Sequence, residues 1–325
     1  MIDEFLKTGS ISESEKIKAD ERFQSLSAFS SVYGIGPNTA RGLYARGLRT
    51  LEHLERYYEV WEDPQVAATS QRDAKTDDDV KDVKPVVIEE ADVRGEGGTT
   101  LIRAALGYRE DLAIKIPRDE VEEIGRLMAA ELEEVEKGCV SIIVGGYRRG
   151  KPESNDVDIV FTHPDKEKEK GLCKKLVKRL IERGLVTHVI HQSSFREHNA
   201  LRTHHWDSLE KALTVFVHPP GSSYARAHVD KHGHRLRRRI DLIFAQPEIY
   251  WTAVVGWTGS TVFERDLRLW AKNEKRVTCG IFDATRSLTR TRRRDSKMMY
   301  AQTEKEVFDI MGLPWIDPTL RNADA

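Results

Sequence analysis

The sequence is poor in cysteine and has no long apolar run. Its three cysteines, Cys139, Cys173 and Cys279, lie far apart among 325 residues and form neither a metal-binding nor a disulfide pattern. Such sparse thiols are typical of a reducing intracellular compartment. No apolar stretch is long enough to span a membrane, and the first residues do not resemble a secretory signal. We therefore expect a soluble intracellular protein without a membrane partner.

Net charge is also nearly absent, because 52 basic residues face 53 acidic ones and leave a formal charge of −1. The whole-chain balance thus argues neither for nor against a nucleic-acid partner. The charges are unevenly distributed, however. Residues 71–96 are acidic, whereas 235–239 and 286–297 are basic clusters. A neutral total can therefore contain a basic groove.

The most informative stretch joins two apolar runs, 140–144 and 156–161, each of which predicts a strand. Successive side chains of a strand alternate between its faces, so Asp156 and Asp158 share a face and lie roughly 7 Å apart. Two carboxylates on one face repel each other unless a cation lies between them, and their hard oxygens suit Mg²⁺ or Mn²⁺. A solvated strand face is the alternative interpretation.

Between these strands lies a turn that begins at Gly145-Gly146 and carries Arg149 and Lys151. Glycines let backbone N–H groups approach a phosphate closely, and the two cations supply charge for a polyphosphate. Gly-Gly alone is often only a turn. A Gly-Gly followed about ten residues later by Asp-x-Asp, however, matches the signature of nucleotidyltransferases. The combination predicts phosphoryl or nucleotidyl transfer.

A third carboxylate, Asp241, interrupts the apolar strand predicted over 237–244 and follows three arginines. An unpaired buried carboxylate is costly, so Asp241 should meet a metal ion or an arginine. It could be a third ligand beside Asp156 and Asp158, acting on an attacking hydroxyl. The alternative is a salt-bridged strand aspartate.

The first sixty residues look helical, and Gly34-Ile35-Gly36-Pro37 separates two predicted helices. This is the pattern of a helix-hairpin-helix element, in which Gly34 and Gly36 expose backbone N–H groups to a DNA phosphate at a helix N-terminus. An ordinary helix connection uses the same residue types. Residues 62–99 are acidic and without aromatic side chains, and we expect them to form a disordered insertion.

Further along, we expect an amphipathic helix that begins at Pro117 and helices over 166–183 and 304–311. We expect strands over 186–190 and 213–217, joined by a polar loop at 191–208. Gly-Trp-Thr-Gly-Ser at 256–260 is expected to open a helix to Glu274. Phe263, Leu267 and Trp270 would form its apolar face, opposite Arg265 and Arg268. A cationic face suits a nucleic-acid strand, although charged faces on helices are commonly only solvated.

Taken in order, the motifs resemble those of family X DNA polymerases over nearly the whole chain. They are Gly-Ile-Gly-Pro-x-x-Ala, Gly-Gly-x-x-Arg-Gly-Lys, Asp-Val-Asp, Arg-Arg-Ile-Asp-Leu, Gly-Trp-Thr-Gly-Ser, Thr-Glu-x-Glu-Val-Phe and Gly-Leu-Pro. The Gly-Gly and Gly-Trp-Thr-Gly-Ser variants look like the polymerase mu and terminal transferase branch, and a fungal member of that branch would fit.

The resemblance implies an α+β fold around a polymerase-beta-like nucleotidyltransferase palm with a mixed sheet. It implies a helical DNA-binding subdomain with the helix-hairpin-helix at 1–61, the acidic insertion at 62–99, the palm at 100–250 and a C-terminal α/β subdomain at 251–325, which would bind nucleotide and template. It also implies a DNA-directed DNA polymerase that fills short gaps during repair, with end joining of double-strand breaks as the expected setting. Its partners would be gapped or broken double-stranded DNA, dNTPs and end-joining factors, and it would be a nuclear monomer.

The site residues that the resemblance implies fall into four groups. Two Mg²⁺ ions, for which Mn²⁺ could substitute, would be held by Asp156, Asp158 and Asp241. The triphosphate would be bound by Gly145, Gly146, Arg149 and Lys151. The sugar and base would be framed by Gly256, Trp257 and Gly259. DNA would be contacted by Gly34, Gly36, Arg239, Arg265 and Arg268, and Na⁺ or K⁺ would be held against a primer phosphate by the backbone carbonyls of Ser30, Val32 and Ile35.

The chain also departs from the family pattern. Residues 2–6 look like the last helix of the family's lyase domain, whose Schiff-base lysine has no counterpart, and no BRCT domain is apparent; lyase activity is therefore not expected. Asn155 stands where this branch has a histidine, which leaves template-independent addition open. Gly256 stands where members that exclude ribonucleotides have a tyrosine, so we expect weak sugar discrimination. The competing interpretations are an RNA-end nucleotidyltransferase and a non-catalytic DNA-end scaffold; the three aspartates argue against the latter.

Overall fold

The computed structural model describes residues 2–58, 60, 86–87, 96–193, 209–227, 235–274, 277–280, 286–290 and 298–324. Most of the expected insertion at 62–99 and most of the expected loop at 191–208 lie outside these ranges. Contacts divide the chain into two units. The first comprises Met1–Asp82, Ala91–Glu110 and Lys231–His234, and the second comprises Val83–Glu90, Asp111–Asp230 and Arg235–Ala325. No helix of the described residues is both long and apolar enough to cross a membrane.

The first unit is helical. Its elements are α1 (Ile2–Thr8), α2 (Ser12–Ala19), α3 (Glu21–Ser30), α4 (Pro37–Ala45), α5 (Leu51–Tyr57) and α7 (Glu96–Ala113) as far as Glu110. The side chain of Asp20 caps α3 by accepting from the Phe23 amide, a common way to satisfy a free N–H group at a helix start. Because α7 begins at Glu96, the segment expected to be an insertion through residue 99 ends earlier than the sequence suggested.

The expected helix, hairpin and helix are present in this unit. α3 ends at Ser30, and α4 begins with Gly36 as its N-cap and Pro37 in its first turn. Gly34 has a φ of +89°, a conformation that residues other than glycine rarely adopt. A Cβ atom at Gly34 would also lie 3.2 Å from Cγ1 of Ile102 on α7. The hairpin therefore requires glycine for two local reasons.

The second unit is organised around a mixed six-stranded sheet in the order β1-β6-β7-β8-β5-β3. Its strands are β1 (Val86–Val87), β6 (Val186–Ser193), β7 (Glu210–Val217), β8 (Arg237–Phe244), β5 (Val157–Thr162) and β3 (Val140–Ile143). β5 pairs with β8, and β1 with β6, in parallel; the other pairs are antiparallel. The expected α+β fold with a mixed sheet is confirmed.

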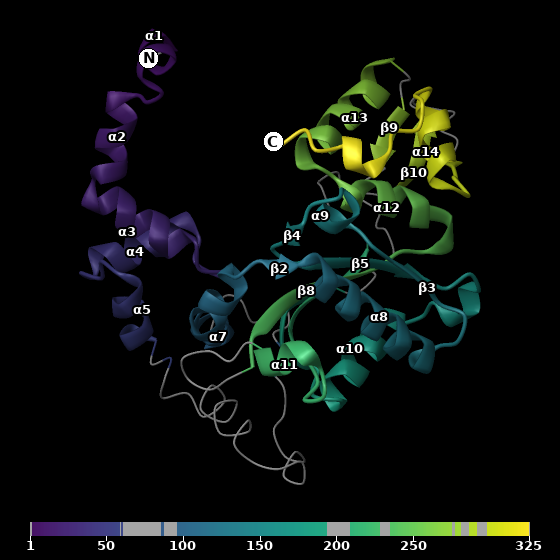
Figure 1. Ribbon diagram of the computed structural model, residues 1–325, viewed down its shortest axis with the longest axis horizontal. Helices are drawn as coiled ribbons and strands as arrows, with labels where there is room; N and C mark the ends of the chain where they lie inside the picture. The colour runs from purple at the N-terminus through teal and green to yellow at the C-terminus, as the bar shows by residue number, and fades with distance from the viewer. Residues whose placement is uncertain are drawn as a thin grey trace. The chain divides into compact units, whose positions relative to one another are not determined.

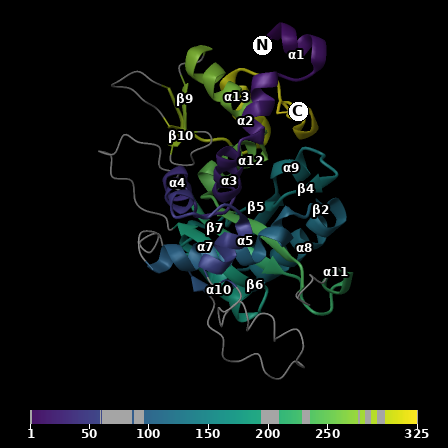
Figure 2. The same cartoon turned by 90° about the vertical axis from the view of Figure 1, so that its left-hand side faces the viewer.

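Helices cover both faces of this sheet. α8 (Arg118–Val135) and α10 (Leu172–Glu182) bury their apolar stripes against one face, and α12 (Tyr250–Thr258) packs on the other (Figure 1). The view turned by 90° shows α13 and α12 above strand β5, with α10 below it (Figure 2). Ile159 packs in the first core and Val160 in the second, as the alternation of a strand requires. Asp158 and Asp241 therefore lie on the face that α12 covers only in part.

A smaller core joins α12 to α13 (Thr261–Glu274) and α14 (Glu304–Met311). The remaining elements are short. They are β2 (Ile116–Pro117), α9 (Gly145–Arg148), β4 (Glu153–Ser154), η3 (Lys166–Lys168), α11 (Ser223–Ala227), η4 (Pro247–Ile249), β9 (Val277–Gly280), β10 (Arg286–Arg290), β11 (Met298–Met299) and η5 (Pro318–Leu320).

Several sequence-based expectations need correction. The prediction of a helix that begins at Gly256 is wrong. Residues 256–258 are the end of α12, and α13 begins at Thr261. Between the two helices, Gly259 has a φ of +67°, which is not a helical conformation. Trp270 remains 41% exposed, and Ala271 takes the buried position beside Leu267. The turn at Gly145 is a helical turn, α9, and the helix expected at 166–183 is divided at Gly171.

Candidate active site

Three carboxylates meet where β5 and β8 lie side by side. Asp158 and Asp241 are register partners in this parallel pair, and Asp156 precedes β5 directly. One oxygen from each of the three lies within 4.8 Å of the others. Asp241 is almost fully buried, with 3% of its side chain exposed, whereas 31% of the Asp156 side chain reaches solvent. The strand pairing brings together the three aspartates that the sequence singled out.

Arg239 is the cation nearest to this cluster. Its Nε and Nη2 donate to the two carboxylate oxygens of Asp241 over 2.9 Å and 2.7 Å, and its Nη1 lies 3.7 Å from Oδ2 of Asp156. Asp241, which was expected to meet a metal ion or an arginine, thus meets Arg239. Of the three carboxylates this guanidinium pairs with Asp241 and Asp156, so negative charge exceeds positive charge within the cluster.

The excess of negative charge, together with burial, shifts the pKa values of the residues in the cluster. Burial, followed by the charges of Asp156 and Asp241, raises the pKa of Asp158 well above its usual value. Burial also raises the pKa of Asp241, although the bonded Arg239 opposes the shift. Burial by itself lowers the pKa of Arg239, but the hydrogen bonds to Asp241 outweigh it and the pKa is raised. A divalent cation would relieve the repulsion, and three hard carboxylates are ligands that Mg²⁺ or Mn²⁺ prefers. The residues therefore fit the metal ions expected here.

The glycine turn packs directly against this cluster. Gly145 has a φ of +62°, and a Cβ atom there would lie 2.2 Å from Oδ2 of Asp158. The amide of Val144 also donates to the carbonyl of Asp158 over 2.9 Å, which ties the turn to β5. Only glycine allows α9 to approach the carboxylates so closely.

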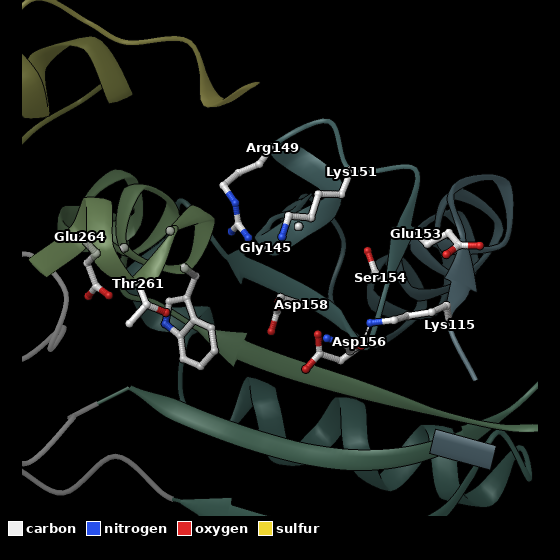
Figure 3. A pocket seen from close by; sticks show the side chains of 15 residues that line it. Lys115, Gly145, Arg149, Lys151, Glu153, Ser154, Asp156, Asp158, Thr261 and Glu264 are labelled. Atoms are coloured by element: carbon white, nitrogen blue, oxygen red, sulfur yellow. Dashed lines mark hydrogen bonds between the residues drawn. The ribbon is translucent and has the colours of Figure 1, made fainter. Parts of the chain in front are cut away.

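A pocket with a volume of about 390 Å³ extends from the carboxylates. Residues 145, 146, 149, 151, 256, 257 and 259, all expected to bind the nucleotide, line it together with Asp156 and Asp158. Figure 3 shows Arg149 and Lys151 pointing from the α9 side toward these two carboxylates. The pocket thus has a cationic wall facing an anionic one.

The residues expected to contact DNA do not form one cluster within the second unit. Arg268 forms an ion pair with Glu264, which lines the pocket. Arg265 is exposed, and its Nε lies 3.3 Å from Oδ1 of Asp266. Gly34 and Gly36 lie in the other unit, as do the carbonyls expected to hold a monovalent cation. Of these carbonyls, that of Val32 accepts from the Ile35 amide over 3.0 Å.

Sequence reasoning missed several residues of this pocket. Lys115, Glu153, Ser154, Thr261 and Glu264 line it, and Nζ of Lys115 donates to Oδ1 of Asn155. The two-residue strands β2 and β4 pair in antiparallel fashion beside Lys115. Strands this short have no periodic pattern that a sequence could reveal.

Missed too were the contacts that hold the cationic wall. Arg148 donates to both oxygens of Glu304, over 2.7 Å and 2.9 Å, and to Oγ1 of Thr258 over 2.9 Å. Arg149 donates through Nε to Oδ1 of Asn322 over 3.0 Å and through Nη1 to the carbonyl of Thr258. These contacts join α9 and the residue after it to α12, to α14 and, through Asn322, to the segment that follows α14.

Comparison with known proteins agrees with this geometry. The family described as DNA polymerase beta palm matches residues 115–247, the DNA polymerase beta thumb matches 253–322, and the fingers domain of DNA polymerase lambda matches 27–66. The expected polymerase-beta-like palm is thereby confirmed.

Three curated relatives match 99% of this chain. DNA polymerase lambda of Arabidopsis thaliana is 32% identical over 324 residues. DNA-directed DNA/RNA polymerase mu of Homo sapiens is 27% identical over 330 residues, and DNA nucleotidylexotransferase of Xenopus laevis is 28% identical over 334. The matches cover 51%, 57% and 57% of these relatives, so the chain spans little more than half their length.

Proposed function

Because the chain belongs to the family X DNA polymerases, in the group that holds the lambda, mu and terminal transferase enzymes, we propose that it is a DNA-directed DNA polymerase. It would transfer a nucleotide from a dNTP to a primer 3′-hydroxyl. The observation that carries this proposal is the cluster of Asp156, Asp158 and Asp241, of which the first two line a pocket opposite its cationic wall.

The three aspartates would hold two Mg²⁺ ions, or Mn²⁺ in their place. When bound, such ions supply Lewis-acid activation of the hydroxyl and neutralise charge on the leaving pyrophosphate. Asp241 is the most buried of the three, and its proposed role is to act on the primer hydroxyl. Arg239, bonded to Asp241, would orient that carboxylate and meet the primer end.

The cationic wall would bind the triphosphate. Arg149 and Lys151 face the carboxylates across the pocket, and Lys115 adds a third cation at its rim. Gly145 and Gly146 let the backbone approach the phosphates. The base and sugar would then lie toward Gly256, Trp257 and Gly259 at the junction of α12 and α13, where the indole offers a stacking surface.

Residues in each of the two units would contact DNA. The hairpin at Gly34 and Gly36 would bind the backbone of the primer strand, with a monovalent cation held by the carbonyls of residues 30, 32 and 35. Arg265 and Arg268 of α13 would meet the template. The substrate would be gapped or broken double-stranded DNA, with end-joining factors as partners, and the site of action would be the nucleus, where the protein would work as a monomer.

The experiment that tests this function measures incorporation of the four labelled dNTPs into a duplex with a one-nucleotide gap, with Mg²⁺ or Mn²⁺. We expect the template to dictate the inserted nucleotide, and the variant Asp241→Asn to lose insertion. Asp309→Asn, an exposed carboxylate on α14, is the matched control and should insert normally. Extension of an unpaired primer, or of an RNA end in preference to the gapped duplex, would contradict the proposal.

The sugar preference is a separate expectation, carried by Gly256 in the pocket wall. A glycine leaves room for a 2′-hydroxyl that a bulky ring would crowd. We expect the ratio of kcat/KM for dNTP over rNTP to stay below about a thousandfold, and Gly256→Tyr to raise it. A wild-type ratio above that value would contradict the expectation while leaving the polymerase function intact.

A further inference from the structure

Arg148 and Arg149 are neighbours in sequence, and of the two Arg149 lines the pocket; they are held in different ways. Arg148 forms a bidentate ion pair with Glu304. Arg149 forms no ion pair within 4.0 Å in the described part of the chain, and its two bonds go to neutral oxygens, the carbonyl of Thr258 and the amide oxygen of Asn322. The carboxylates of Asp324 and Asp158 act on Arg149 through their charge but form no ion pair with it within 4.0 Å in the described residues. Arg149 is thus fixed in place without a bonded carboxylate, and its N–H groups can still meet an anion in the pocket.

Asn322 grips Arg149 at two points. Its Oδ1 accepts from Nε of Arg149 over 3.0 Å, and its Nδ2 donates to the backbone carbonyl of Arg149 over 3.1 Å. The same Nδ2 lies 3.1 Å from the carbonyl of Thr319, so Asn322 is anchored on its own segment. A planar amide that both donates to and accepts from one residue restricts where the guanidinium can point.

The segment around Asn322 is itself tied to the far wall of the pocket. The amide of Ser260 donates to the carbonyl of Arg321 over 3.2 Å, and the amide of Ala323 donates to Oγ of Ser260 over 3.1 Å. The carboxylate of Asp324 accepts from the amides of Thr261 and Val262, at the start of α13, over 3.0 Å and 2.7 Å. Asn322 therefore acts from a fixed frame and not from a free tail.

We propose that Asn322 is a positioning residue for the incoming nucleotide: it aims Arg149 at the triphosphate and, being uncharged, leaves the charge of Arg149 to the phosphates. The proposal rests on the proposed function, since it assigns a role within the same nucleotide site. Asn322 does not line the pocket and acts only through Arg149.

The variants Asn322→Ala and Asn322→Asp distinguish the orientation of the Arg149 guanidinium from the neutralisation of its charge. Asn322→Ala releases the guanidinium, so we expect the KM for dNTP to rise about tenfold, with kcat within about twofold. Asn322→Asp keeps the contact with Nε but places a carboxylate there that competes with the phosphates, so the KM should rise further. Inhibition by tripolyphosphate should weaken in parallel, because that anion has neither sugar nor base. Leu320→Ala, whose side chain is 76% exposed on the same segment, is the matched control and should change neither constant.

A double-mutant cycle then decides whether Asn322 works through Arg149. In an Arg149→Ala background, Asn322→Ala should raise the KM by less than about twofold, since no guanidinium remains to be aimed. Equal effects of Asn322→Ala in both backgrounds, or a fall in kcat and Tm with an unchanged KM, would overturn the inference. If the wild-type protein inserted no nucleotide, the proposed function would fail; the cycle could still be run on nucleotide binding, followed by the shift in Tm that dNTP causes.

Discussion

Two of the clusters of buried charge in the second unit are balanced in opposite ways. In the first, the carboxylates of Asp156, Asp158 and Asp241 lie together, and Arg239 pairs with Asp241 and Asp156. In the second, two arginines, Arg148 and Arg321, share the one carboxylate of Glu304. Both clusters hold a side chain that is nearly or wholly removed from solvent, so burial alone does not distinguish them.

The pKa values of the carboxyl groups in the two clusters are shifted in opposite directions. In the first cluster burial and like charges raise the pKa of Asp158. In the second, burial would again raise the pKa of Glu304, but hydrogen bonds from Arg148 and the charge of Arg321 outweigh it and lower the pKa to about 2. The difference shows which cluster is complete as it stands. The Glu304 cluster holds structure together, whereas the aspartate cluster is adapted to receive a cation.

The largest expected effect comes from Asp158→Asn, which removes one of the crowded carboxylates. Insertion into gapped DNA should fall by at least about a thousandfold, because a metal ligand is lost. In EDTA, however, the variant should be more stable than the wild type, by about 1 kcal/mol, since the repulsion within the cluster is relieved. Urea unfolding measures this gain, and a loss of stability would contradict the account of the cluster.

Metal ions sharpen the same test. Adding Mg²⁺ should raise the Tm of the wild-type protein and leave that of Asp158→Asn nearly unchanged, because a cation that binds only the folded state stabilises it. Equal shifts in the two proteins would show that Mg²⁺ binds elsewhere.

The next effect concerns the glycine that lets α9 approach the first cluster. Gly145→Ala places a methyl group onto the carboxylate of Asp158 in a positive-φ conformation, so we expect a loss of about 2–3 kcal/mol in the free energy of unfolding and about a hundredfold in insertion. Gly146→Ala is the matched control for stability, since its Cβ would meet the side chains of Lys151 and Ser154 at ordinary contact distances of 3.4 Å and 3.7 Å. Equal destabilisation by both variants would show that the clash with Asp158 is not the cause.

The second cluster is tested by Glu304→Gln, which leaves two buried arginines without a charged partner. We expect a loss of about 3 kcal/mol at pH 7, with Asp309→Asn on the same helix changing stability by less than about 0.5 kcal/mol. Since the pKa of Glu304 is lowered from 4.5 to about 2, its stabilisation is complete above pH 4.5 and is lost as the pH falls toward 2. The difference between wild type and variant should therefore shrink by about 2 kcal/mol between pH 7 and about pH 3. A difference independent of pH would mean that the charge of Glu304 is not what stabilises the cluster.

The smallest effect comes from Trp315→Phe in the same cluster. Nε1 of Trp315 donates to Oε2 of Glu304 over 3.0 Å, and phenylalanine keeps the ring while removing that donor. Because the two arginines still satisfy the carboxylate, we expect a loss of only about 1 kcal/mol in urea unfolding and no change in insertion. A loss in the free energy of unfolding as large as that of Glu304→Gln would contradict this, because it would mean that the indole stabilises Glu304 more than the two arginines do.

Local pattern was enough to find the catalytic candidates. Asp-x-Asp on a strand fixes a shared face through the alternation of side chains, and a carboxylate inside the apolar run at 237–244 requires a partner wherever that strand packs. The hairpin at Gly34 was predictable for a similar reason, since the need for a positive φ belongs to the residue itself. α12 escaped notice because its apolar residues lead directly into the Gly-Trp-Thr-Gly-Ser motif, and only the backbone at Gly259 marks where one helix ends.

The sequence by itself therefore determined the side chains of the candidate site: the carboxylates, the glycines and cations proposed to bind phosphate, and most of the strands and helices that hold them. Only the tertiary structure decided the parallel register that places Asp158 beside Asp241, and the partners of the cationic wall. Glu304 and Asn322 are far in sequence from Arg148 and Arg149, and single polar side chains in separate segments leave no periodic signal. Their pairing follows from the packing of α9 and α12 with α14 and the segment after it, which satisfies buried charges that no local pattern could pair.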